Sequence, residues 1–146
     1  MEDGITDARS GAGGGPDGRA PVLLRWRAPI SESDVGRLHA DAFRTTTGYQ
    51  WCRQFSLGWV TASEGGRLVG FVNVAWDGGR HAVLLDTAVA PDRQRRGIGR
   101  QVVLRAVEES RKAGCGWVHV DYERHLHDFY AACGFKSTAA GVLRLV

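Results

Sequence analysis

Long hydrophobic runs are absent from this sequence of 146 residues. The longest unbroken run of hydrophobic residues is five, from Phe129 to Cys133, whereas a membrane-spanning helix needs about 18 or more. The first residues also lack the basic start and the apolar stretch of a secretory signal. These absences predict a cytoplasmic protein that has no membrane as a partner.

Cysteine is also scarce, and the chain contains only Cys52, Cys115 and Cys133. The number is odd and no two are spaced as CxxC, which argues against a disulfide framework and against a cysteine-rich zinc site. His125 and His127 lie close together beside Asp128, but two histidines without further regularly spaced ligands are ordinary polar residues of a helix start. We therefore predict that the protein holds no metal.

Acidic charge gathers in the first 20 residues, and basic charge gathers in the rest. The formal net charge is +3, from 19 basic and 16 acidic residues. Residues 1–20 hold four of the acidic residues and two of the arginines, which leaves a net charge of +5 from residue 21 onward. This opening stretch has six glycines and no apolar run, so burial cannot repay the entropy of ordering it. We predict a flexible Gly-rich tail over residues 1–20 and one domain over residues 21–146.

Hydrophobic patterning over that domain predicts a mixed α/β fold. After a strand from residue 22 and a helix capped by Ser31, two glycine-containing turns at 64–67 and 77–80 join three antiparallel strands into a meander. The chain then alternates as βαβαβ. The expected later elements are a strand over 81–89, a helix from 97–100 to Gly114, a strand over 117–121, a helix over 126–133 and a closing strand over 142–146.

The segment between residues 86 and 100 suggests an anion site. Gly97 and Gly99 begin the predicted helix, where unpaired backbone N–H groups and the positive end of the helix dipole attract phosphate. Four arginines surround this point, namely Arg93, Arg95, Arg96 and Arg100. The segment lacks the third glycine of a dinucleotide fingerprint and the Lys-Ser/Thr of a nucleotide P-loop. A pyrophosphate site and a tight turn with a solvated basic rim both fit it.

Three strings decide between them: LLDTAVAP at 84–91, QRRGIG at 94–99 and FYAACGF at 129–135. Together they make residues 82–136 resemble the GNAT superfamily of acyl-CoA-dependent N-acetyltransferases. In that family Q/R-x-x-G-x-G/A follows the fourth strand and binds the CoA pyrophosphate through backbone amides. The pantetheine arm inserts where the fourth and fifth strands splay apart. The resemblance implies acetyl-CoA as co-substrate, contacted by Ala88, Val89, Gln94, Arg95, Arg96, Gly97, Ile98, Gly99 and Arg100.

The same resemblance implies the acid of the reaction. Tyr130 matches the tyrosine that protonates the departing CoA sulfur, although a tyrosine at this place could also simply pack in the core. Cys133 lies in the same element and is expected to be a core thiol, so acetyl transfer should be direct, without an acyl-enzyme. The sequence departs from the family at Glu123, where many relatives carry an asparagine that helps to hold CoA.

The first candidate for the general base is Asp86, because it interrupts an apolar strand and a buried carboxylate is costly unless paired or functional. A structural carboxylate bound to a neighbouring loop is the other interpretation, and His119 and Asp121 are reserves. Asp86, Asp121 and Glu123 favour a cationic acceptor. The loop 44–57, with Tyr49 and Trp51, and the segment 137–141 are expected to contact it.

The sequence therefore predicts an enzyme that transfers acetyl from acetyl-CoA to a primary amine in a ternary complex. Its acceptor would be a small-molecule or peptide amine, and the protein would be a monomer or a homodimer without a nucleic-acid partner. Two other functions stay open. One is a non-catalytic module that binds CoA, and the other is a nucleic-acid-binding domain that uses the arginines between 93 and 100.

Overall fold

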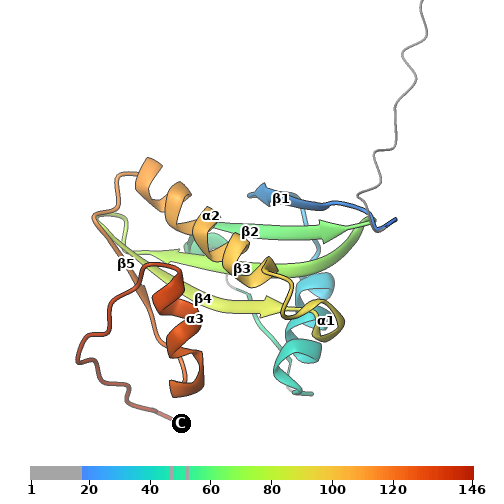
Figure 1. Ribbon diagram of the computed structural model, residues 1–146. Helices are drawn as coiled ribbons and strands as arrows, with labels where there is room; N and C mark the ends of the chain where they lie inside the picture. Colours follow the sequence, from blue (N-terminus) through green and yellow to red (C-terminus); the bar gives the residue numbers. More distant parts are fainter. Residues whose placement is uncertain (1–17, 47, 52) are drawn as a thin grey trace, which may run out of the picture.

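The computed structural model describes residues 18–46, 48–51 and 53–146. The strands of these residues form one sheet in the order β1-β2-β3-β4-β5, and helices pack against it (Figure 1). The strands are β1 (Val22–Trp26), β2 (Ser56–Glu64), β3 (Arg67–Trp76), β4 (His81–Val89) and β5 (Trp117–Val120). The helices are α1 (Glu32–Phe43), α2 (Ile98–Lys112) and α3 (His127–Ala132), with short 3-10 helices η1 (Arg53–Phe55), η2 (Pro91–Arg93) and η3 (Arg124–Leu126).

The sheet confirms the predicted mixed α/β class. Strands β1 to β4 pair antiparallel, and the two predicted turns join β2 to β3 and β3 to β4, whereas β4 and β5 are parallel because α2 connects them. The residues that predicted the starts of two helices are also found at those starts. Ser31 caps α1 by accepting a hydrogen bond from the backbone N–H of Asp34 at 3.1 Å, and Gly97 begins α2 with a left-handed φ of 79°.

Helices cover the sheet on both faces around β3. A Cβ at Gly70 would lie 2.9 Å from Ile98 Cγ2, so α2 approaches this face too closely for any side chain at that position. The next residue, Phe71, faces the other way and packs against Trp51, which belongs to the segment after α1. Figure 1 shows α2 crossing the sheet with its first turn beside the end of β4, where the predicted site lies.

The closing strand predicted over residues 142–146 is wrong. Residues 135–146 contain no helix or strand, and Val142, Leu143 and Val146 are exposed. The apolar residues of this segment have the composition of a strand, but β propensity takes effect only where a neighbouring strand pairs with the backbone. The strand β5 has no such partner on its outer side among the described residues.

Two further predictions concern membrane-spanning helices and the N-terminal tail. None of the helices in the described part of the chain combines the length and the apolar character that crossing a bilayer requires. The predicted tail over residues 1–20 lies outside the described residues except for its last three positions.

Candidate active site

The site is built on an open edge of β4. Strand β5 pairs with β4 over four residue pairs, from His81 with Trp117 to Leu84 with Val120, and then ends. From Leu85 onward this edge of β4 has no strand beside it among the described residues, as the splayed pair implied. The predicted backbone contacts at Ala88 and Val89 lie on this stretch. The Val89 carbonyl accepts a hydrogen bond from Gln94 Nε2 at 3.2 Å.

A β-bulge interrupts the other edge of β4. Phe71 of β3 pairs with Ala88 and Asn73 pairs with Leu85, so Asp86 and Thr87 together oppose a single residue of β3. The backbone of Asp86 is left-handed, with a φ of 57°, which few residues other than glycine adopt. Bulges of this kind turn a side chain in a new direction. Asp86 is therefore not the buried carboxylate that the apolar pattern predicted, because its side chain is 32% exposed.

The bulge turns Asp86 toward α1 and the loop after it. The hydroxyl of Tyr49 donates a hydrogen bond to Asp86 Oδ2 at 2.9 Å. His39 Nε2 lies 3.5 Å from Asp86 Oδ1, and the His39 ring stacks on Tyr49 with 4.2 Å between centroids. The sequence analysis expected Tyr49 near the site and missed His39. The sequence does place His39 alone on the otherwise apolar face of α1. Packing in the core explains such a histidine equally well.

Tyr130 lies on the other side of β4 from Asp86. Its side chain is 4% exposed and stacks on Tyr122 with 4.7 Å between ring centroids. Its hydroxyl donates a hydrogen bond to Thr87 Oγ1 at 3.4 Å, one residue along the chain from Asp86. Burial raises the pKa of Tyr130 above its usual range, and the bond to Thr87 offsets only part of that effect. A phenol that stays protonated can serve as a proton donor.

The start of α2 has the form of an anion cradle. Gly97 is the N-cap and offers no side chain to bond the first-turn N–H groups, which therefore point outward without intrahelical partners. Gly99 is tightly enclosed: a Cβ there would lie 3.3 Å from the Phe129 ring and 3.4 Å from Val89 Cγ2. Ile98 is buried and directs its side chain into the core. Ile98 can therefore contribute only its backbone N–H to the cradle.

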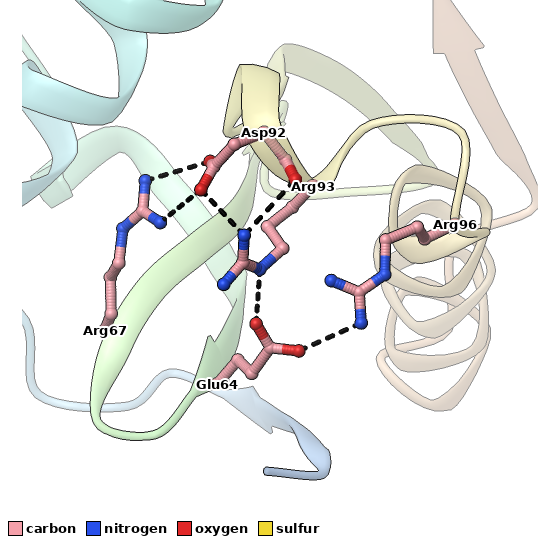
Figure 2. Close-up of polar contacts among 5 residues, drawn as sticks. All are labelled: Glu64, Arg67, Asp92, Arg93 and Arg96. Atoms are coloured by element: carbon pink, nitrogen blue, oxygen red, sulfur yellow. Dashed lines mark hydrogen bonds and ion pairs between the residues drawn. The ribbon is translucent and has the colours of Figure 1, made fainter. Parts of the chain in front are cut away.

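Two of the four arginines near the cradle are paired with a carboxylate. Arg93 and Arg96 both bind Glu64, at the end of β2, through different carboxylate oxygens (Figure 2). The expectation that all four arginines surround a phosphate stays a prediction, and two of the four side chains already have a partner. Arg95 and Arg100 are exposed and form no ion pair with the described residues. The sequence analysis missed Glu64, because it lies about 30 positions before its partners and belongs to no motif.

Several other residues that the sequence suggested for the site do not contribute to it. Asp121 and Glu123 are exposed, which weakens the acidic cluster and leaves Asp86 as the carboxylate of the site. His119 is exposed and bonds to His81 at 2.8 Å between ring nitrogens. Trp51 is buried and packs on Phe71 as a core residue.

Two cavities border the fold. A groove of about 1070 Å³ runs along β5 and α3, and it includes Tyr122, Phe135 and part of the segment 137–141 that was expected to contact the acceptor. A second groove, of about 810 Å³, lies between α1 and strands β1 to β3 and contains none of the predicted site residues. Within the described residues, no group of three or more His, Cys, Asp or Glu side chains is placed to hold a metal ion.

Comparison with known proteins decides the family. The model of the acetyltransferase (GNAT) family matches residues 22–135. The chain belongs to the GNAT acetyltransferase family. A curated relative, the uncharacterized N-acetyltransferase ycf52 of Porphyra purpurea, is 32% identical over 76 residues. That match covers 52% of this chain and 44% of the relative, so the chain matches less than half of the relative's length.

Solved GNAT structures share the fold. A Staphylococcus aureus protein described as a probable acetyltransferase superposes with a TM-score of 0.73 at 19% identity, over 86% of this chain and 99% of that one. Glucosamine-6-phosphate N-acetyltransferase from Arabidopsis thaliana superposes with a TM-score of 0.69 at 18% identity, over 85% and 97% of the two chains. At these identities the likeness establishes the architecture of this GNAT chain and leaves its acceptor open.

The ion pairs beside the cradle predict a loss of stability in acid. The hydrogen bond from Arg93 lowers the pKa of Glu64 below its ordinary value of 4.5, and the bond from Arg67 lowers the pKa of Asp92 in the same direction. A carboxylate whose pKa is depressed by folding stabilises the protein above its unfolded pKa and loses that effect as the pH falls through the folded value. The free energy of unfolding, measured with urea, should therefore decline as the pH is lowered from about 4.5. In Glu64→Gln the decline should be smaller, and an unchanged decline would contradict this role for Glu64.

Proposed function

We propose that this GNAT protein transfers an acetyl group from acetyl-CoA to a primary amine by direct attack in a ternary complex. The observation that carries the proposal is the convergence of three features on the open edge of β4. The cradle at Gly97 follows the end of that stretch, Asp86 lies in the bulge, and the Tyr130 hydroxyl bonds Thr87, the other residue of the bulge. A non-catalytic CoA-binding module would need the cradle alone.

The donor is held mainly by backbone groups. First-turn N–H groups from Gly97 to Arg100 would bind the pyrophosphate, and Arg95 and Arg100 would add charge at its exposed side. Backbone groups of Ala88 and Val89 would hold the pantetheine arm along the unpaired edge of β4. The N–H of Val89 would stabilise the negative charge that develops on the thioester oxygen. Gln94 supports this region by bonding the Val89 carbonyl.

Side chains supply the proton transfers. Asp86 is accessible enough to take a proton from the acceptor amine, directly or through water, and Tyr49 and His39 hold its carboxylate in place. Tyr130 would give a proton to the departing sulfur, which its raised pKa allows because the phenol stays protonated. Burial also raises the pKa of the Cys133 thiol, which disfavours a reactive thiolate and supports direct transfer. The negative charge of Asp86 favours a cationic amine, either a small molecule or a peptide.

Acetyl-CoA should raise the melting temperature, because a ligand that binds only the folded state stabilises it, by about 2.7 kcal/mol at a hundredfold excess over the dissociation constant. Gly97→Val should abolish the shift, since a β-branched residue is strained at a φ of 79° and closes the cradle. Gly78→Val is the matched control. Gly78 has a φ of 77° and open space around it, but it lies in the β3–β4 turn. No shift in the parent protein at saturating acetyl-CoA would refute donor binding.

Tyr130→Phe should retain the fold and acetyl-CoA affinity while it lowers turnover by roughly 10² or more, the scale for losing a general acid. Phenylalanine keeps the stacking on Tyr122 and removes only the hydroxyl. Tyr122→Phe removes a hydroxyl from the other ring of the same stack, and it should leave turnover within about twofold of the parent. Release of free CoA with a panel of amines measures both. Undiminished turnover in Tyr130→Phe would leave that tyrosine as core packing.

Asp86→Asn should lower the rate most at low pH, where the acceptor amine is protonated and needs a base, and the rate should partly recover as the pH rises. The expected loss at low pH is roughly 10² or more. Asp121→Asn, at an exposed aspartate, is the control and should follow the parent profile. A uniform loss at every pH would contradict a base at Asp86 and favour a structural carboxylate.

A further inference from the structure

Glu64 is the one buried residue with a charged side chain among those that the structure describes. It ends β2, and its side chain is 7% exposed. Each carboxylate oxygen binds a different arginine: Oε2 accepts from Arg93 Nε, and Oε1 accepts from Arg96 Nη2 at 3.0 Å (Figure 2). A single buried carboxylate thus fixes two points of the turn that leads into α2.

One of the two residues between these points has a strained backbone. Arg95 has a φ of 64°, in the left-handed region that disfavours any residue with a Cβ. Such a conformation persists only where its surroundings hold it. Arg93 and Arg96 lie on either side of Arg95, and the anchoring of both to Glu64 supplies this hold. Gly97 then completes the reversal of the chain into α2.

A second carboxylate extends the network on its exposed side. Asp92 accepts two hydrogen bonds from Arg67, at 2.8 and 3.1 Å, and a further one from Arg93 Nη1 at 2.7 Å. Both Arg67 and Asp92 are about half exposed, and exposed ion pairs contribute little stability. The buried group, Glu64, is therefore the main anchor of the turn.

We propose that Glu64 is a positioning residue that holds the turn from Arg93 to Gly97 in the shape that binds the pyrophosphate of the donor. It keeps two arginine side chains out of the cradle and aims the first-turn N–H groups of α2 at the ligand. The inference rests on the proposed function, because it takes the cradle as the donor phosphate site. It adds a residue from β2 that never touches the ligand.

The test compares two donors, one with and one without the 3′-phospho-ADP part that contains the pyrophosphate. Acetyl-CoA carries the pyrophosphate, and S-acetylpantetheine lacks it while keeping the arm that would lie along β4. In Glu64→Gln the dissociation constant for acetyl-CoA, measured by calorimetry, should rise roughly 10- to 100-fold, as expected when a binding group is misplaced by about 1 Å. The dissociation constant for S-acetylpantetheine, measured by NMR titration, should stay within about twofold of the parent value. Glu64→Asp retains the charge on a shorter arm, and it carries the same test if Glu64→Gln does not fold.

Glu109 provides a matched control. Its side chain is 12% exposed and binds Arg105 at 2.7 Å and Lys112 at 3.4 Å, all within the second half of α2. Glu109→Gln removes the same charge from a similar double pair, so both dissociation constants should match those of the parent.

Three results would overturn the proposal. An equal loss of affinity for both donors in Glu64→Gln would show a general structural effect, and tighter binding of acetyl-CoA would show that Glu64 competes with phosphate for its arginines. A parent protein that binds no acetyl-CoA would refute the donor site together with this inference. A parent that binds acetyl-CoA but acetylates no amine would refute only the proposed reaction, because the comparison of affinities needs no acceptor.

Discussion

The strand β4 is hydrogen-bonded to β3 from Ala82 to Val89, but to β5 only as far as Leu84. The open strand edge and the positions of both candidate proton-transfer residues depend on this unequal pairing. The edge released by β5 leaves peptide groups free for a ligand, and the bulge on the other edge turns Asp86 toward α1. Because the bulge spans Asp86 and Thr87, it also places the residue that bonds Tyr130 next to the candidate base.

The positive charge at the start of α2 is partly compensated within the protein. Of the four arginines between positions 93 and 100, two are paired with the single carboxylate of Glu64, and Arg93 is also paired with Asp92. What remains for a ligand is the partial charge of a helix N-terminus and two exposed side chains. A compact anion aligned with the helix axis satisfies this arrangement better than an extended polyanion, which weakens the case for a nucleic-acid partner at this surface.

The parts of the fold that the sequence predicted are those fixed by local chemistry. The Ser31 cap, the glycine turns and the start of α2 at Gly97 each follow from a few adjacent residues. The bulge was not predictable, because it depends on the register between β3 and β4 and not on the residues of either strand alone. The pairing of Glu64 with Arg93 and Arg96 was missed for a related reason, since it joins positions that are 29 and 32 residues apart. The strand at 142–146 was predicted wrongly, because the apolar composition of the segment was the only evidence for it.

The enclosure of Gly99 divides the site into two halves with unequal freedom to change. Next to Phe129 and Val89 a methyl group would fit only if its neighbours shifted slightly, and the proposed backbone contacts to the donor offer no side chain that selection could exchange. The half around Asp86 is different, because Tyr49 lies in a surface loop that is not part of the sheet. Under the proposed function, new acceptors could therefore arise by substitution in that loop while the donor half stays as it is. A fold of this kind can diversify in what it acetylates without evolving a new way to hold its acetyl donor.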